Sequence, residues 1–263
     1  MKRHQTIGDL SAVITGLLLA FNMPVSIPLW MVVIGAVVSI VVVKQFFGGI
    51  GQNFVNPALA GRIVLLTSFP VAMSTWTQPL TWTMKNLDGV TSASPLSSIH
   101  TMLSSGQTPD VSLVEMLIGW RAGCLGETCA IALILGGIYL VVRKVISPTI
   151  PLAYIGTVAA IMLIAGKGSF TFMVYELLGG GLMLGAIFMA TDYTTSPITF
   201  KGKIIFGIGC GLITSVIRIF GNLPEGVSYS IIIMNILVPL IEKATLPKPF
   251  GTPKKEKKEA EAK

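Results

Sequence analysis

Four acidic residues lie within or at the ends of strongly apolar segments: Asp9, Glu127, Glu176 and Asp192. A carboxylate is costly in lipid, so an acid that is retained there favours a role in cation passage or ligand contact. A structural explanation is equally open, because a carboxylate at a helix start is stabilised by the helix dipole. Asp9 and Glu127 stand at expected helix starts. The sequence therefore gives four candidates for an ion path without choosing among them.

A second group with chemical potential is the hydroxyl-rich stretch DGVTSASPL at positions 88–96, which holds Thr91, Ser92 and Ser94. Its opening Asp-Gly pair is typical of a turn. Composition alone favours a solvated linker here. The three hydroxyls are nevertheless the densest set of nucleophilic oxygens in this part of the chain.

The cysteines predict no metal centre. Cys124 and Cys129 flank LGET, a spacing unlike that of zinc motifs, and no further Cys or His ligands stand nearby. We interpret them, with Cys210, as small apolar packing residues. The net charge of +7 does not indicate a nucleic-acid partner, because five of the 19 Lys and Arg residues fall in the last ten positions.

Composition indicates that these residues are positioned by helices in a membrane. The chain is 52% hydrophobic and 12% charged, whereas soluble domains carry about 25% charged residues. We predict an all-α integral membrane protein in contact with lipid. Eight apolar spans are expected, at Leu10–Phe21, Ile27–Phe46, Pro57–Met73, Glu127–Val142, Pro151–Ala165, Met173–Met189, Lys203–Phe220 and Gly226–Glu242. Several are shorter than the ~20 residues of a full crossing, as expected for interrupted helices.

Basic residues predict the orientation of the spans. With the C-terminal tail in the cytoplasm, the inside segments and their edges hold Lys2, Arg3, Lys44, Arg62, Arg143, Lys144, Lys201 and Lys203. The outside segments hold fewer, namely Lys85, Arg121, Lys167 and the edge residue Arg218. By the positive-inside rule both termini are cytoplasmic. The expected regions are membrane helices at 1–74, an extracytoplasmic loop at 75–125, membrane helices at 126–245 and a basic cytoplasmic tail at 246–263.

A weak internal repeat predicts an inverted-repeat helical bundle. Gly16–Pro24 resembles Gly181–Ala190, and Lys44–Gly49 resembles Ile217–Asn222. Spans one to three then pair with spans six to eight in opposite directions, a pattern of transporter folds. Spans four and five have no partners. We therefore expect a complete version to have two more spans before Met1.

Several long stretches have the character of family motifs: 13–66, 68–76, 88–96, 125–128, 177–197 and 217–241. The most specific are GGIGQNFVNPALAG at 48–61 and FMATDYTTSP at 188–197. Through them the chain resembles the NqrB/RnfD family, which comprises RnfD of the Rnf complex and its relative NqrB of the sodium-pumping NADH:quinone oxidoreductase. The resemblance covers nearly the whole chain. It implies an architecture similar to urea transporters, with about ten spans when complete.

The resemblance also implies a covalent flavin. Family members attach FMN through its phosphate to a hydroxyl, usually of Thr, and that position here is Ser94. Thr91 and Ser92 belong to the same motif, and Arg121 is expected to face the flavin phosphate. Arg121 as an interface anchor is the structural alternative.

Further flavin contacts are implied at Glu127 and Thr128 of the LGET stretch and at Asp192 and Thr194 of FMATDYTTSP. The family also holds a non-covalent riboflavin, to which the hydroxyls of the latter stretch are candidate donors. Asn53 and Asn56 precede Pro57 at the start of a span, where Pro begins a helix. These two amides are expected either to satisfy interrupted backbone or to line a cavity.

The function implied by the resemblance is electron transfer in a complex that moves electrons between ferredoxin and NAD and transports Na⁺ or H⁺. Its partners would be the other membrane and extracytoplasmic flavoprotein subunits and the iron–sulfur subunits, in a bacterial or archaeal inner membrane. One alternative is the quinone-reducing relative. Another, of a different class, is a urea-transporter-like solute channel with no redox role, against which the 88–96 motif argues.

Overall fold

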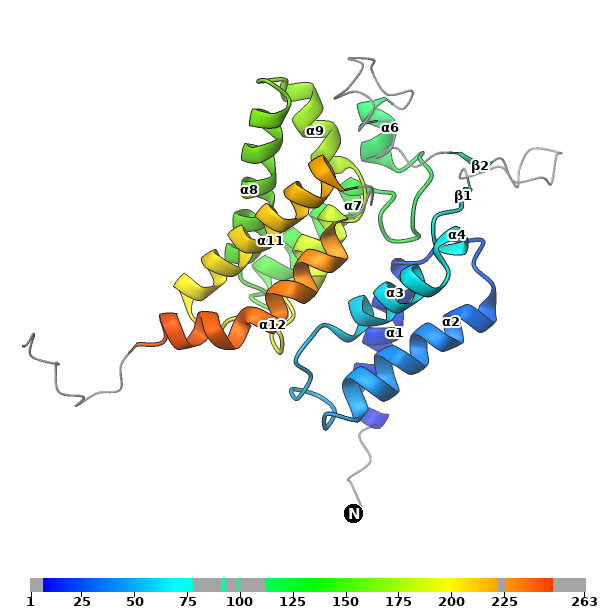
Figure 1. Ribbon diagram of the computed structural model, residues 1–263, viewed down its shortest axis with the longest axis vertical. Coiled ribbons are helices and arrows are strands. Elements are labelled where there is room, and N and C mark those ends of the chain that lie inside the picture. Colours follow the sequence, from blue (N-terminus) through cyan, green and yellow to red (C-terminus); the bar gives the residue numbers. More distant parts are fainter. Residues whose placement is uncertain (1–6, 78–90, 93–98, 100–111, 222–225, 248–263) are drawn as a thin grey trace, which may run out of the picture.

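The structure is a computed structural model that describes residues 7–77, 91–92, 99, 112–221 and 226–247 (Figure 1). Nearly all of the described residues in regular structure are helical. The first part of the chain forms η1 (Ile7–Asp9), α1 (Ser11–Phe21), α2 (Leu29–Ala36), the π-helical η2 (Val37–Gln45), α3 (Pro57–Ser68) and α4 (Pro70–Met73). Strands β1 (Trp76–Thr77) and β2 (Thr91–Ser92) pair antiparallel, with Trp76 opposite Ser92.

The second part of the chain is also helical. It consists of α6 (Leu113–Ile118), α7 (Ala130–Val142), α8 (Thr149–Ala165), α9 (Phe170–Leu178), α10 (Leu182–Leu184), the π-helical η4 (Gly185–Met189), α11 (Phe200–Phe220) and α12 (Val227–Thr245). The short helix α6 begins with a capping box between Ser112 and Glu115.

Each of the eight ranges predicted as apolar spans contains a helical segment. Within the described residues, α11 and α12 are long and apolar enough to cross a membrane. α9 and α10–η4 together would make a third crossing, bent by 67°. The other apolar helices have 10–17 residues. The all-α class is confirmed apart from the small sheet, while the eight crossings and the inverted repeat stay predictions.

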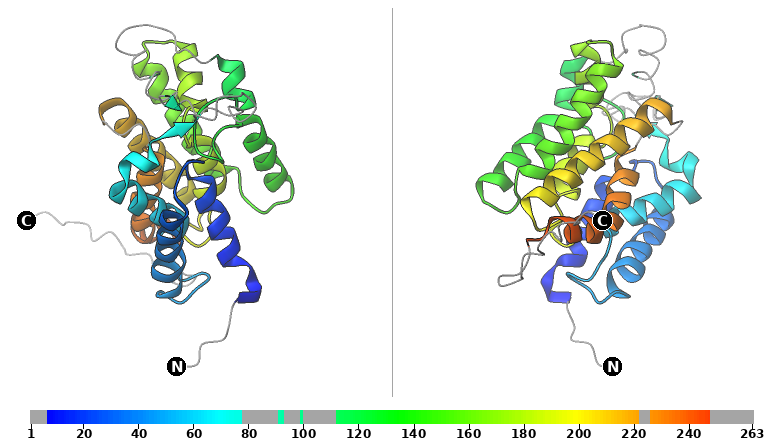
Figure 2. Two further views of the ribbon diagram at one scale, coloured as in Figure 1. Left: turned by 90° about the vertical axis from the view of Figure 1, so that its right-hand side faces the viewer. Right: turned by 60° about the vertical axis from the view of Figure 1, so that its left-hand side comes forward.

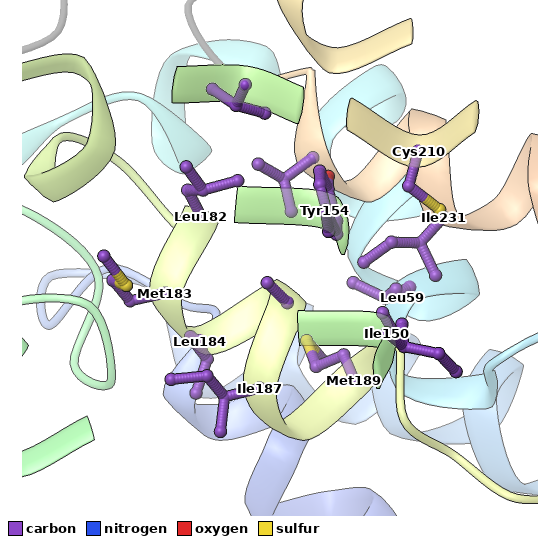
Figure 3. Close-up of a cluster of buried hydrophobic side chains, with 14 of the residues drawn as sticks. Leu59, Ile150, Tyr154, Leu182, Met183, Leu184, Ile187, Met189, Cys210 and Ile231 are labelled. Carbon is purple, nitrogen blue, oxygen red and sulfur yellow. The ribbon is translucent and has the colours of Figure 1, made fainter. Parts of the chain in front are cut away.

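The helices form two groups that meet along α12 (Figures 1 and 2). In the first group α3 packs against α2 and η2, and in the second α11 lies between α8 and α12. α12 also contacts α3, which joins the groups. Buried side chains from both groups, including Leu59, Tyr154 and Ile231, form one cluster around α10 and η4 (Figure 3). The outer surface remains strongly apolar, with residues such as Leu29 and Phe220 each 82% exposed.

Local sequence explains where α3 begins. The Asn56 side chain accepts hydrogen bonds from the N–H groups of Ala58 and Leu59, and Pro57 occupies the first turn. An Asn cap followed by Pro is a strong helix start, because Pro has no N–H to leave unsatisfied. The predicted role of Asn56–Pro57 is therefore confirmed.

The predicted span Met173–Met189 is interrupted. α9 ends at Leu178, Gly180 adopts φ +61°, and the chain resumes as α10 at a bend of 67°. A left-handed φ is accessible to glycine at little cost. The three consecutive glycines at 179–181 thus end one half-helix and start another.

We predict that Gly61→Ala destabilises the packing of α3 on α2 and η2. A Cβ at Gly61 would lie 2.7 Å from the Gly35 carbonyl oxygen and would clash with Ser39 Oγ. Overpacking of this kind costs about 1–3 kcal/mol. Thermal denaturation of the purified protein in detergent measures the loss. Gly16→Ala is the matched control, because nothing lies within 4 Å of its Cβ position; equal melting temperatures for the two variants would contradict the prediction.

Candidate functional site

A cavity of about 290 Å³ lies where the first and second parts of the chain meet. Its apolar lining residues come mainly from α1, the end of α7 and η4, and its polar ones from α1, η2 and the segments that precede α3 and follow η4. The polar lining residues are Ser11, Thr15, Lys44, Asn53, Asn56, Thr191, Asp192, Tyr193 and Thr194. Both specific motifs of the sequence, 48–61 and 188–197, contribute to this cavity.

Lys44 is the buried cation of the cavity. It lies in η2 with 5% of its surface exposed, and its Nζ donates to Thr15 Oγ1 at 3.3 Å. Asp9 and Asp192 both act electrostatically on its ammonium group. Lys44 is therefore not a solvated charge of an inside loop, as the orientation argument assumed, because η2 continues through it and turns its side chain inward.

Asp192 is held in a tight turn after η4. Its carboxylate accepts hydrogen bonds from the hydroxyls of Thr194 at 3.0 Å and Thr195 at 3.3 Å. Asn53 Nδ2 in turn donates to Thr194 Oγ1 at 3.1 Å. This chain of contacts brings Asp192 and Thr194, both predicted site residues, together with an amide from the other motif.

Asn56 ties the same two motifs together through the backbone. While its oxygen caps α3, its Nδ2 donates to the Met189 carbonyl at the end of η4, at 3.1 Å. With its amide oriented to suit its neighbours, Asn235 of α12 accepts from the Asn56 N–H and donates to the Thr195 carbonyl. Asn53 and Asn56 therefore do both things that were expected of them, since they satisfy interrupted backbone and line the cavity.

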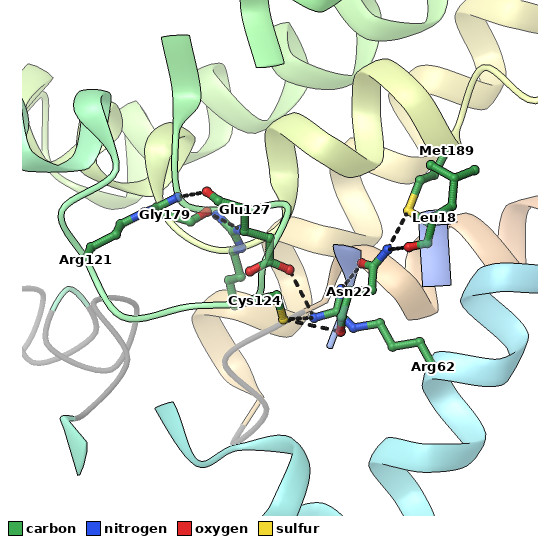
Figure 4. A network of polar contacts seen from close by, with 9 residues as sticks. Leu18, Asn22, Arg62, Arg121, Cys124, Glu127, Gly179 and Met189 are labelled. Atoms are coloured by element: carbon green, nitrogen blue, oxygen red, sulfur yellow. Dashed lines mark hydrogen bonds and ion pairs between the residues drawn. The ribbon is translucent and has the colours of Figure 1, made fainter. Parts of the chain in front are cut away.

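A second polar group lies deeper in the protein and centres on Arg62 of α3, which is 3% exposed (Figure 4). Its guanidinium donates to Glu127 Oε1 at 3.1 Å, to Asn22 Oδ1 and to Cys124 Sγ. Asn22 ends α1, so the network joins α1, α3 and the loop before α7. The predicted place of Arg62 at the edge of an inside loop is wrong, because the residue is buried within a helix.

Glu127 differs from its predicted position. α7 begins at Ala130, so Glu127 precedes the helix and is stabilised by Arg62 rather than by a helix dipole. Arg121 donates to the carbonyl oxygens of Glu127 and Thr128, and so fixes the loop that presents this carboxylate (Figure 4). Its contact with a flavin phosphate stays a prediction, as does flavin binding by Glu127 and Thr128.

The remaining acids have separate environments. Glu176 of α9 is 4% exposed and pairs with Arg218 of α11 at 3.0 Å. Arg218 was expected at an outside edge but is buried along the last turns of α11. Asp9 is exposed and accepts from the Ser11 N–H at 2.8 Å, and hydrogen bonds from Ser11 lower the pKa of its carboxyl group. Asp9 therefore contacts the first residue of α1, but it is not the N-cap of that helix, because Leu10 holds that position and no side-chain hydrogen bond caps it.

The predicted attachment site is only partly within the described residues. Thr91 and Ser92 form β2, whereas Ser94 lies outside the described part of the chain. Among the residues that the structure describes, no cluster of three or more His, Cys, Asp or Glu side chains could hold a metal ion.

Sequence reasoning missed three of the four cations that are buried in the described part of the chain. It weighed the acids within apolar segments but treated Lys44, Arg62 and Arg218 as loop charges. The signal was present, because all three stand inside or beside long apolar runs, where a cation is as costly as an acid. Arg62 and Arg218 each pair with an acid that the sequence analysis had singled out, Glu127 and Glu176 respectively.

Together, the apolar exterior, the half-helices and the charges paired inside define an α-helical membrane protein. Comparison with known proteins is consistent with this class. The chain matches the NQR2, RnfD, RnfE family over residues 1–251.

The chain is 48% identical to the D subunit of a Na⁺-translocating ferredoxin:NAD⁺ oxidoreductase complex from Acetobacterium woodii, over all of this chain and 79% of that protein. It is 44% identical to the D subunit of a proton-translocating ferredoxin:NAD⁺ oxidoreductase complex from Clostridium ljungdahlii, over 94% of this chain and 76% of that protein. The D subunit of an ion-translocating oxidoreductase complex from Stutzerimonas stutzeri is 37% identical, over 92% and 76% respectively. The chain belongs to the NQR2, RnfD, RnfE family.

We predict that the Arg62–Glu127 pair is strongly coupled. Arg62→Met or Glu127→Leu alone leaves an uncompensated buried charge, which costs about 3–5 kcal/mol of unfolding free energy. The double variant removes both charges and should lose much less than the sum of the two single losses. Denaturation of the four proteins in one detergent gives the coupling energy. Additive losses would show that the two charges do not depend on each other.

Proposed function

We propose that this chain is a flavin-bearing membrane subunit of an ion-translocating ferredoxin:NAD⁺ oxidoreductase, and that it relays electrons in a process coupled to cation transport. The observation that carries the proposal is the family match over residues 1–251, together with relatives whose names state this complex. Those names differ in the ion, Na⁺ in one and the proton in the other. The coupled ion is therefore proposed as one of these two.

The first proposed cofactor is FMN, joined through its phosphate to Ser94. Serine offers the same nucleophilic oxygen as the threonine that is usual in the family, so a phosphoester can form. A phosphoester tether fixes the flavin without involving the isoalloxazine ring, which supplies the electron-transfer chemistry when it is bound. The protein then controls the position and surroundings of the ring.

The second proposed cofactor is a non-covalent riboflavin in the 290 Å³ cavity. The residues present fit such a group. Leu18, Ile146 and Phe188 offer apolar surface for a flat ring, and Thr194 and Asn53 offer hydrogen bonds at its edge. Lys44 adds a buried positive charge to the same wall. An apolar pocket with a few convergent polar groups is the usual form of a cofactor site.

The proposed orientation places both termini in the cytoplasm and the segment 75–125 outside. In Figure 1, η1 and the C-terminal end of α12 lie towards the lower part of the molecule, while α6 and the β1–β2 sheet lie towards the upper part. The exposed Lys144 follows α7 on the side proposed as cytoplasmic. Without Lys44 and Arg62, the positive-inside argument depends mainly on such residues and on the basic tail.

Two alternatives remain distinguishable. The quinone-reducing relative predicts activity with NADH and quinone rather than with ferredoxin and NAD⁺. A solute channel predicts no flavin at all. The named relatives favour the ferredoxin-dependent complex over both alternatives.

We predict that Ser94→Ala abolishes covalent flavin attachment. The chain, co-expressed with a flavin-attaching enzyme and run on a denaturing gel, should give a fluorescent band that is absent from this variant. Ser92→Ala is the matched control, because it removes a neighbouring hydroxyl and should keep the band. A band that persists in Ser94→Ala, or disappears in Ser92→Ala alone, would place the attachment elsewhere. No band in the wild type would count against covalent attachment.

We also predict that Thr194→Val lowers riboflavin binding about tenfold, because one hydroxyl that joins Asn53 to Asp192 is lost. Chromatography of the flavin released from the denatured complex measures riboflavin, while the fluorescent band reports FMN separately. Thr157→Val is the control, because its hydroxyl bonds within α8 away from the cavity. Unchanged riboflavin in Thr194→Val would exclude this wall of the cavity from the site.

A further inference from the structure

The interruption between α9 and α10 leaves backbone carbonyl oxygens, which are hydrogen-bond acceptors, in need of a positively charged partner. α9 ends at Leu178, and a half-helix that ends inside a membrane fold leaves carbonyl oxygens without helical partners. The negative end of the helix dipole is directed to the same place. The Glu176 side chain adds a full negative charge one turn from this end.

Arg218 of α11 fills this position. Its Nη1 donates to the Glu176 carbonyl oxygen at 2.6 Å and to Glu176 Oε2 at 3.0 Å, and its Nη2 donates to the Gly179 carbonyl oxygen at 3.1 Å. The side chains of Arg218 and Glu176 are 1% and 6% exposed. One guanidinium group therefore meets two backbone carbonyls and a carboxylate in a site closed to water.

These oxygens are the ligands that a small monovalent cation takes in broken-helix membrane proteins. Unwound carbonyls and the C-terminal ends of half-helices coordinate Na⁺ in transporters of this kind. The fit to guanidinium is incomplete, because Arg218 Nε is buried and has no partner among the described residues. The oxygens thus compensate the positive charge of the guanidinium group, but they do not accept hydrogen bonds from all of its N–H donors.

We propose that the break between α9 and α10 is a monovalent-cation site that the protein fills permanently with its own cation, Arg218. The tethered charge stabilises the break at every cation concentration. It also keeps a transported ion from being held at Glu176. The site is independent of the flavins and of the proposed electron-transfer function.

The Arg62–Glu127 pair provides a matched comparison. It is equally buried, and Arg62 donates to the side chains of Asn22, Cys124 and Glu127. Arg62 itself lies inside α3, although its partner Asn22 directly follows the last residue of α1. Removing Arg62 therefore uncovers a buried acid among the side chains of Asn22 and Cys124.

The test is to replace the tethered cation with a free one. Arg218→Ala should melt at a lower temperature than the wild type in choline chloride. NaCl at equal ionic strength should raise its melting temperature by about 3 °C or more beyond any rise seen in the wild type. The full chain in detergent is used, and KCl is measured in parallel. Rescue by NaCl that saturates with concentration supports a bound cation.

Two controls separate a site from a general salt effect. Arg218→Ala combined with Glu176→Gln should lose the rescue, because the charged ligand is gone. Arg62→Ala should be destabilised without comparable rescue. Equal rescue of Arg62→Ala and Arg218→Ala, or no rescue of a folded Arg218→Ala, would overturn the proposal.

A second pair of variants keeps the proposal testable if Arg218→Ala does not accumulate. Arg218→Lys retains the positive charge with different donor geometry, whereas Arg218→Gln retains hydrogen bonding without charge. If the site requires a cation, Arg218→Lys should accumulate in membranes at several times the level of Arg218→Gln. Equal levels, or more of Arg218→Gln, would show that hydrogen bonding alone is needed, and the proposal would be wrong.

Discussion

Compensation of buried charge is the constraint on which the rest of this structure depends. An isolated charge in an apolar interior is so unfavourable that it must be paired, hydrogen-bonded or neutralised. Two buried pairs, Arg62–Glu127 and Arg218–Glu176, each join an arginine to a glutamate at about 3 Å. These pairs need not add net stability over apolar replacements. They do fix which segments can lie together, because any other arrangement would leave a charge unpaired.

The pairs and amides act between segments that are far apart in the chain. Arg62 and Glu127 are 65 positions apart, and Asn56 and Met189 are 133 apart. Local helix formation cannot supply such contacts. In a membrane, moreover, apolar side chains gain little by leaving lipid for a neighbouring helix, so polar contacts and close packing of small residues carry more of the association. Close packing of small residues is illustrated by Gly61 against Gly35, and a polar contact by Asn56 with Met189. Both contacts involve the first half of α3 or its cap.

The sequence predicted the features that depend on neighbouring residues. The apolar runs located the helical segments, and Asn56–Pro57 marked the start of α3, because caps and periodicity are local properties. The bend at 179–181 was harder to predict, since consecutive glycines suit close packing and a break equally well. The buried positions of Lys44, Arg62 and Arg218 could not be assigned from one sequence, because the partner of each charge lies on another segment. The proposed covalent site at Ser94 rests on resemblance and lies outside the described residues.

The different environments of the four acids narrow where a transported cation can bind. Glu127 and Glu176 are each neutralised by an arginine, so a cation there would have to displace a bound guanidinium. Asp9 is exposed and accepts a hydrogen bond from the Ser11 N–H at the start of α1. Asp192 differs from these three, because it lines the cavity and its hydrogen bonds come from the hydroxyls and N–H groups of its own turn rather than from a close ion pair. Lys44 contributes a positive charge to the same cavity, which opposes a second cation near Asp192 and favours any negative charge that a cofactor gains there. If the proposed flavin occupies this cavity, an electron reaching it and a cation reaching Asp192 would change the same local electrostatic balance, which would give a physical basis for coupling the two.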